Sequence, residues 1–321
     1  MRHSIRPPSP FARAGFAWEP RRSGELQLGL WRMRWAARGG NNRRLVFIPG
    51  LGDSPISWLA VLTLIAPTLH KEFNELVLVD FPGFCGFLAK KRAFHSLELM
   101  KGALFDTLDS LKPEALMGHS LGGYLSALYA IECAQGVRPR APHFSGLSIA
   151  DRLEPRGPAK LILVAPTGVF SCAEDRRTLR DKYQQAFAEK KDGFRHIRPH
   201  LFATEPFWFR LVANRLSEFF TKDDISQFIS SLTDEHELTD KAHLIRSEVH
   251  IFWGENDALL PLRTMDAWLE RLPKAHGILI KGAGHSPQIE APRRVASELT
   301  QLLRTTRSKQ DSPRLKYFFS K

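Results

Sequence analysis

The chain has 321 residues, of which 43% are hydrophobic and 25% charged, which is ordinary for a globular protein with one large domain or two small ones. Its net charge of +12 is concentrated at the two ends, because residues 1–44 carry +8 and residues 304–321 carry +5, which leaves −1 for the part between them. This distribution argues against a central nucleic-acid groove, and no apolar run has the roughly 18–20 residues of a membrane span.

The two ends of the chain are expected to lie outside the folded body. We predict a flexible basic leader over residues 1–22 and a basic tail over residues 305–321, because neither has an apolar pattern and the leader has no secretory signal. The chain has three scattered cysteines, too few for a disulfide framework or a zinc site: Cys85, Cys133 and Cys172. This fits a reducing compartment, and we predict a cytoplasmic location.

Strand and helix patterns alternate along most of the chain. Residues 25–35 alternate in part between apolar and polar side chains, which predicts one or two antiparallel strands at a sheet edge. Continuous apolar runs, typical of strands covered on both faces, follow at residues 45–48, 76–79, 115–117, 160–165, 249–253 and 277–280. Helical patterns occupy residues 58–69, 96–111, 122–134, 262–271 and 292–304. The alternation predicts an α/β fold with a mostly parallel central sheet flanked by helices.

The pattern changes between residues 169 and 246, where no strand-like run occurs. Charged helical patterns alternate with aromatic clusters there, and we expect about four helices. His196 and His200 are four residues apart, as in some metal sites, but Pro199 disfavours a regular helix between them and no third ligand follows. We therefore predict neither a metal nor another cofactor.

The sharpest local signal is Gly118-His119-Ser120-Leu121-Gly122, between a predicted strand and a predicted helix. A strand that reverses into a helix so abruptly forces its central residue into strained backbone geometry, and the flanking glycines remove Cβ atoms that would clash. The turn leaves the hydroxyl of Ser120 exposed above the strand, at the positive end of the next helix. Ser120 is therefore our candidate nucleophile.

The other candidates come from the rule that ligands bind beyond the carboxyl ends of parallel strands. A serine needs a base, and His285 follows the last predicted strand in a glycine-rich turn. His276 would fall at the opposite end of that strand, and His119 lies inside the turn and is expected to point elsewhere. Asp257, at the end of the preceding strand, is the expected partner of His285, with Glu255 as the rival acid.

An acyl-transfer site also needs donors for the oxyanion that forms on the attacked carbonyl. The backbone N–H of Leu121, directly after the candidate nucleophile, is one expected donor. The second should come from the loop after the strand at residues 45–48, where the N–H of Leu51 lies between two glycines.

Together these motifs resemble the α/β-hydrolase superfamily, over residues 25–304. The order Ser120, Asp257, His285 is that of the family, and the Asp80-Phe81-Pro82-Gly83-Phe84 stretch is similar to its D-x-P-G-x-G loop. This chain has Pro49-Gly50 where the family often has His-Gly, and its second loop glycine is displaced to Gly86. Related dehalogenases and epoxide hydrolases use an aspartate nucleophile, and Ser120 speaks against both.

The resemblance implies a core over residues 23–168 and 247–304, with a helical cap over residues 169–246 whose aromatic side chains could line an acyl pocket. It implies a serine hydrolase for a carboxylic ester or related acyl bond of a small to medium apolar substrate. Three alternatives stay open: a carbon–carbon bond hydrolase of the meta-cleavage type, a non-catalytic ligand-binding protein with the same fold, and, less favoured, an acyltransferase. The sequence leaves the oligomeric state open.

Overall fold

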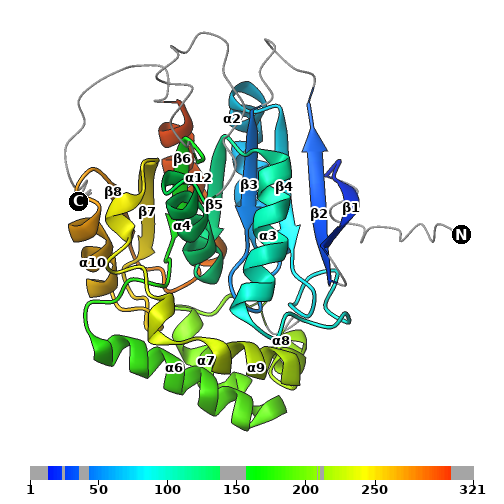
Figure 1. Cartoon of the computed structure of the whole chain (residues 1–321), viewed down its shortest axis with the longest axis vertical. Helices are drawn as coiled ribbons and strands as arrows, with labels where there is room; N and C mark the ends of the chain where they lie inside the picture. The colour runs from blue at the N-terminus through cyan, green and yellow to red at the C-terminus, as the bar shows by residue number, and fades with distance from the viewer. Residues whose placement is uncertain are drawn as a thin grey trace, which may run out of the picture.

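The structure is a computed structural model that describes residues 14–23, 26–35, 43–137, 157–207, 209 and 213–304. Its centre is an eight-stranded sheet in the order β1-β2-β4-β3-β5-β6-β7-β8 (Figure 1). The strands are β1 (Ala17–Ser23), β2 (Leu26–Arg34), β3 (Arg44–Ile48), β4 (Glu75–Asp80), β5 (Ala115–His119), β6 (Lys160–Val164), β7 (Glu248–Gly254) and β8 (His276–Ile280). The β1–β2 and β2–β4 pairs are antiparallel, and β4, β3, β5, β6, β7 and β8 run parallel.

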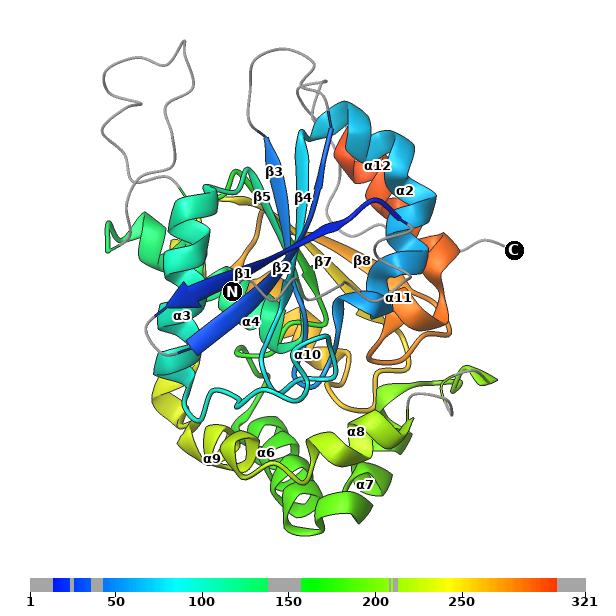
Figure 2. The ribbon, with the colours of Figure 1, turned by 90° about the vertical axis from the view of Figure 1, so that its right-hand side faces the viewer.

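Helices cover both faces of this sheet (Figure 2). They are α2 (Leu59–Glu72), α3 (Leu97–Leu111), α4 (Leu121–Ala134), α6 (Ala173–Ala188), α7 (Phe194–Leu201), α8 (Ala213–Phe219), α9 (Asp223–Ser231), α10 (Arg263–Arg271), α11 (Pro287–Glu290) and α12 (Pro292–Arg304). Helices α2 and α12 lie together on one face, and α3 and α4 lie on the other. Helices α6 to α9 form a layer beyond the carboxyl ends of the parallel strands.

The two-residue period of the strands explains why both faces are covered. On β3, Leu45 and Phe47 belong to the apolar cluster under α2 and α12, whereas Val46 and Ile48 belong to the cluster under α3 and α4. Successive side chains of a strand point to opposite faces, so a continuous apolar run requires a helix layer on each side. The predicted α/β fold, with its mostly parallel sheet and flanking helices, is confirmed.

Two local predictions were wrong. The leader was expected to extend to residue 22, but Ala17–Ser23 is strand β1 and pairs with β2. Helix α7 runs through Pro199, which was expected to prevent a regular helix between the two histidines, and His196 Nε2 lies 2.6 Å from Glu189 Oε2. Residues 1–13 of the leader, the predicted turn at 38–42 and the tail at 305–321 lie outside the described residues.

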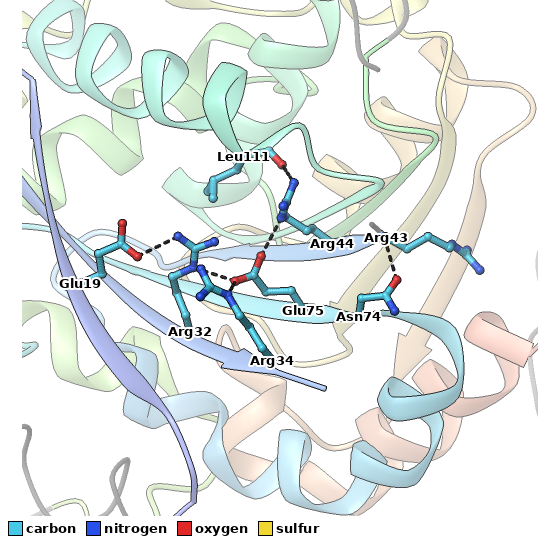
Figure 3. Close-up of polar contacts among 8 residues, drawn as sticks. All are labelled: Glu19, Arg32, Arg34, Arg43, Arg44, Asn74, Glu75 and Leu111. Carbon is cyan, nitrogen blue, oxygen red and sulfur yellow. Dashed lines mark hydrogen bonds and ion pairs between the residues drawn. The ribbon is translucent and has the colours of Figure 1, made fainter. Parts of the chain in front are cut away.

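At the amino ends of β3 and β4, three arginines surround one carboxylate (Figure 3). Arg32, Arg34 and Arg44 each donate from Nε to Glu75, at 2.6–2.7 Å, and the Glu75 side chain is only 5% exposed. Burial alone would raise the pKa of Glu75, but the hydrogen bonds from these arginines outweigh it and lower that pKa to about 2. The cluster ties the edge strand β2 to β3 and β4.

We expect Glu75→Gln to lower the free energy of unfolding at pH 7 by about 3 kcal/mol, because it leaves partly buried guanidinium groups without their counter-ion. The contribution of Glu75 is present above its unfolded pKa near 4.5 and is lost as the pH falls toward 2, so the two proteins should converge in acid. Urea unfolding between pH 3 and 7 measures this. Glu270→Gln is the control, since Glu270 is 76% exposed, and an equal loss there would contradict the prediction.

Candidate active site

The turn between β5 and α4 holds Ser120 in strained geometry, with φ of 50° and ψ of −114°. A Cβ on Gly118 would lie 2.2 Å from the carbonyl oxygen of Gly122, and one on Gly122 would lie 2.1 Å from that of Ile48, so both positions require glycine. The Ser120 N–H donates to the Val164 carbonyl at 2.9 Å, which ties the turn to the next strand. The serine is thereby fixed at the carboxyl edge of the sheet, half-buried, at the start of α4.

His285 and Asp257 form a buried pair at the same edge. His285 Nδ1 lies 2.8 Å from Asp257 Oδ2, and their side chains are 3% and 0% exposed. The other oxygen of Asp257 accepts from the N–H groups of Leu259 and Leu260, at 2.9 and 2.8 Å. Asp257 is thus held from two sides, and it fixes the orientation of the imidazole.

His119, the residue before the serine, contacts His285 of this pair. Its Nε2 is 2.9 Å from the carbonyl oxygen of His285, and the two rings have their centres 5.0 Å apart. Its Nδ1 is 3.5 Å from Asp53 Oδ2. The sequence predicts that His119 points elsewhere, and the contact with His285 is therefore not expected from it. Its position inside the turn was visible in the sequence, but its contact with His285 depends on how two distant loops pack.

Two further carboxylates hold the loop that carries His285. Glu255, the rival acid, accepts from the N–H of Gly282 at 3.0 Å and has no contact with His285 among the described residues. Glu290 accepts from the N–H of Gly284 at 2.8 Å and from those of Ala203 and Thr204 in the segment after α7. Glu290, which no sequence pattern predicts as a site residue, links the His285 loop to the helical layer.

The loop after β4 is organised by Asp80. Asp80 is fully buried and accepts from the N–H of Phe87 at 2.8 Å, and a Cβ on Gly86 would lie 1.8 Å from Asp80 Oδ1. Gly86, the displaced second glycine of the loop, therefore packs directly against the Asp80 carboxylate. Lys222, before α9, donates to the carbonyl oxygens of Gly83 and Ala89, so this loop also anchors the helical layer.

Burial raises the pKa of Asp80 to about 6, against the hydrogen bond from Phe87 that lowers it. The folded protein then holds this proton to a higher pH than the unfolded chain, so ionisation of Asp80 reduces stability as the pH rises from about 4 to 7. We expect wild type to lose up to about 3 kcal/mol relative to Asp80→Asn over that range. Urea unfolding of both proteins at several pH values checks this, and a constant difference between them would contradict it.

A cavity opens from Ser120 toward the helical layer. Its empty volume is about 860 Å³, and its walls are mainly apolar, with a few charged side chains among them. It is lined by Leu51, Ser120, Leu121, Tyr124, Thr167, Gly168, Phe170, Arg176, Leu179, Arg180, Tyr183, Phe228, Ile229, Leu232, Thr233, His236, Glu237, Leu259 and Leu260. Ser120 and the two residues expected to supply oxyanion donors therefore face one space.

Helix α6 forms part of the roof of this cavity. Lys182 Nζ donates to the Ala258 carbonyl at 3.0 Å, and Asp175 pairs with Arg263 at the start of α10. Burial, together with the charge of Asp257, raises the pKa of the Tyr183 hydroxyl. The roof is thus tied to the loop that carries Asp257.

Comparison with known proteins identifies the fold family. The model of the alpha/beta hydrolase family matches residues 45–298 of this chain, which is most of its length. The chain belongs to the α/β-hydrolase family. The predicted resemblance, and with it the prediction of an enzyme of this family, are confirmed.

This α/β-hydrolase is similar to lipases and esterases. The Xenopus laevis monoacylglycerol lipase abhd6-B is 23% identical over 91% of this chain and 87% of the relative. A bacterial membrane phospholipase A has a TM-score of 0.68 at 19% identity, over 93% of this chain and 89% of that one. The 2-hydroxy-6-oxo-6-phenylhexa-2,4-dienoate hydrolase of Rhodococcus sp. strain RHA1 has a TM-score of 0.64 at 16% identity, over 90% and 99%.

Within the described ranges, no helix has both the length and the apolar character needed to cross a membrane. The same residues contain no cluster of three or more histidine, cysteine, aspartate or glutamate side chains arranged to hold a metal ion. The cytoplasmic location stays a prediction.

Proposed function

We propose that this α/β-hydrolase is a serine hydrolase that cleaves a carboxylic ester, or a related acyl bond, through an acyl-enzyme. The observation that carries the proposal is the buried His285–Asp257 pair, 2.8 Å apart, at the edge where the strained Ser120 meets an apolar cavity. Such a pair is what a weak hydroxyl nucleophile needs for activation. The hydrogen bond between Ser120 and His285 belongs to the proposal and is not among the described contacts.

In the first half of the reaction, His285 Nε2 takes the proton of Ser120 while Oγ attacks the carbonyl carbon. Asp257 holds the ring with its Nδ1–H toward the carboxylate, so that Nε2 is the acceptor, and it stabilises the imidazolium that forms. His285 then gives the proton to the leaving alcohol as the ester bond breaks. In the second half His285 takes a proton from water as the water attacks the acyl carbon, and it returns that proton to Ser120 Oγ as the bond from Oγ to the acyl carbon breaks and the acid leaves.

The backbone N–H groups of Leu51 and Leu121 are the proposed oxyanion donors. Leu121 is the first residue of α4, where backbone N–H groups have no acceptor within the helix, and both residues face the cavity beside Ser120. This chain has Pro49-Gly50 where related proteins often have His-Gly. Because the proposed donor from this loop is the backbone N–H of Leu51, the difference at position 49 does not remove it.

The cavity supports a small to medium apolar acyl group. Its walls include Leu179, Phe228 and Leu232 from the helical layer, and we propose that residues 169–246 act as a cap that contributes to substrate selection. The similarity to a monoacylglycerol lipase supports the choice of an ester. The substrate is thus a small acyl compound, and the mechanism invokes no metal or organic cofactor.

A carbon–carbon bond hydrolase is the second candidate, because the Rhodococcus dienoate hydrolase shares the fold. A substrate panel separates the possibilities: p-nitrophenyl esters of increasing acyl length, ring-cleavage dienoates, and a fluorophosphonate probe. We expect turnover of esters, with a preferred chain length, and covalent labelling of Ser120. Turnover confined to dienoates would favour the second candidate, and a folded protein that neither labels nor turns over any substrate would favour a ligand-binding protein.

A further inference from the structure

A second cavity lies at the amino ends of the strands, away from Ser120. Its empty volume is about 340 Å³, and it is lined by Glu19, Arg21, Leu30, Arg32, Arg44, Thr107, Ser110 and Leu111. Arg44 begins β3 and Leu111 ends α3, whereas Ser120 follows the carboxyl end of β5. The hydrolase reaction proposed above therefore makes no use of this cavity.

Positive charge exceeds negative charge around this cavity. Three of its lining residues are arginines and one is a carboxylate, Glu19, which accepts from Arg32 Nη1 at 2.8 Å. The Glu75 carboxylate behind the wall is shared by Arg32, Arg44 and Arg34 (Figure 3). Arg34 does not line the cavity, so the three lining arginines, set against Glu19 and Glu75, leave a surplus of one positive charge.

Hydrogen-bond donors are also in surplus. A guanidinium has five N–H groups, but among the described residues Arg21 donates only to Ser110 Oγ, at 2.6 Å. Arg44 donates to Glu75 and to the Leu111 carbonyl. The hydroxyls of Ser110 and Thr107 donate to backbone carbonyls of their own helix, so the donors left for a ligand are the N–H groups of the arginines. The cavity therefore offers several guanidinium donors from different directions.

We propose that this cavity binds a phosphate group, held by Arg21, Arg32 and Arg44. A phosphate group complements this positive surplus in sign, and its tetrahedral oxygens can accept from guanidinium groups that come from three strands. Glu19 competes with it for Arg32, but the Glu19 side chain is 44% exposed and can turn toward solvent. The same chemistry suits inorganic phosphate, a small phosphate ester or a lipid head group.

Binding of inorganic phosphate to the full chain, measured by isothermal titration calorimetry at constant ionic strength, tests the proposal. We expect saturable binding that Arg21→Gln weakens about tenfold, as loss of a charge-assisted hydrogen bond should. Glu19→Gln should strengthen it about threefold, because it removes a competing negative charge. Arg43→Gln is the matched control, since Arg43 lies at the same end of the sheet, is not among the lining residues and points away from the other arginines in Figure 3.

The outcomes are distinct. No saturable binding to the wild type, or equal weakening by Arg21→Gln and Arg43→Gln, would overturn the proposal. Arg21 has one described hydrogen bond, at the surface, so circular dichroism should show that its variant is folded. Glu19→Gln gives an independent check in the opposite direction, because a purely structural network would not bind phosphate more tightly when a carboxylate is removed. Ser120→Ala should bind phosphate normally, which separates this site from the hydrolase site.

Vesicle sedimentation distinguishes the sources of the phosphate. Phosphatidic acid vesicles, compared with phosphatidylcholine vesicles, would retain the wild type more than Arg21→Gln if the ligand is a lipid head group, and free phosphate would release it. Binding of inorganic phosphate with equal sedimentation of wild type and Arg21→Gln would assign the site to a soluble phosphate compound.

Discussion

Ester turnover should fall by at least about 10⁴-fold in kcat when Ser120 is replaced by alanine, with the fold unchanged. The reason is that the acyl-enzyme route loses its nucleophile, whereas the backbone donors and the cavity remain. The side chain of Ser120 is half-buried, and its strained backbone gains nothing from the hydroxyl, so the free energy of unfolding should change little. Steady-state kinetics on the preferred p-nitrophenyl ester and labelling by a fluorophosphonate measure the effect.

Ser126→Ala is the matched control for this substitution. Ser126 lies on α4, the helix that follows Ser120, is fully buried and donates to the Gly122 carbonyl at 2.7 Å, but it does not line the cavity. Its removal should cost about 1 kcal/mol of stability and leave kcat within a few-fold. Undiminished turnover by Ser120→Ala would remove this serine from the mechanism, and an equal loss in both variants would indicate damage to the turn instead.

Much of the sheet could be predicted because its parallel strands are short apolar runs that end in glycine or polar residues. The run at residues 76–79, for example, corresponds to β4 at Glu75–Asp80. Once the strand ends were known, the rule that their carboxyl ends share one edge was enough to select Asp257 and His285 from many acids and histidines. The structure places these two side chains in contact.

The features that could not be predicted depend on tertiary contacts. Strand β1 contains Pro20, two arginines and a glutamate, and it is a strand because β2 offers it an edge, where proline is tolerated. Two hydrogen bonds each join segments more than 80 residues apart: that of His119 to the His285 carbonyl and that of the Ala203 N–H to Glu290. No local pattern carries such information, since each residue alone is compatible with a solvent-exposed position.

The role of Asp257 can be separated from its contribution to structure, because its two oxygens have different partners. Oδ1 accepts from Leu259 and Leu260, and Oδ2 faces His285 Nδ1. In Asp257→Asn the amide oxygen can keep the two loop hydrogen bonds, whereas the NH₂ group faces the imidazole. Because Nδ1 must then accept, the ring proton moves to Nε2, and His285 can no longer take the proton of Ser120.

We therefore expect Asp257→Asn to lower kcat by about 10⁴-fold while its unfolding transition stays close to that of the wild type. Glu255→Gln is the control, because Glu255 lies in the same loop and accepts from Gly282 without touching His285, so kcat should change by less than about threefold. Steady-state kinetics measure kcat of both variants, and urea unfolding measures their stability. A large loss of kcat in Glu255→Gln together with a small one in Asp257→Asn would reassign the acid and refute the geometry proposed for the proton transfer.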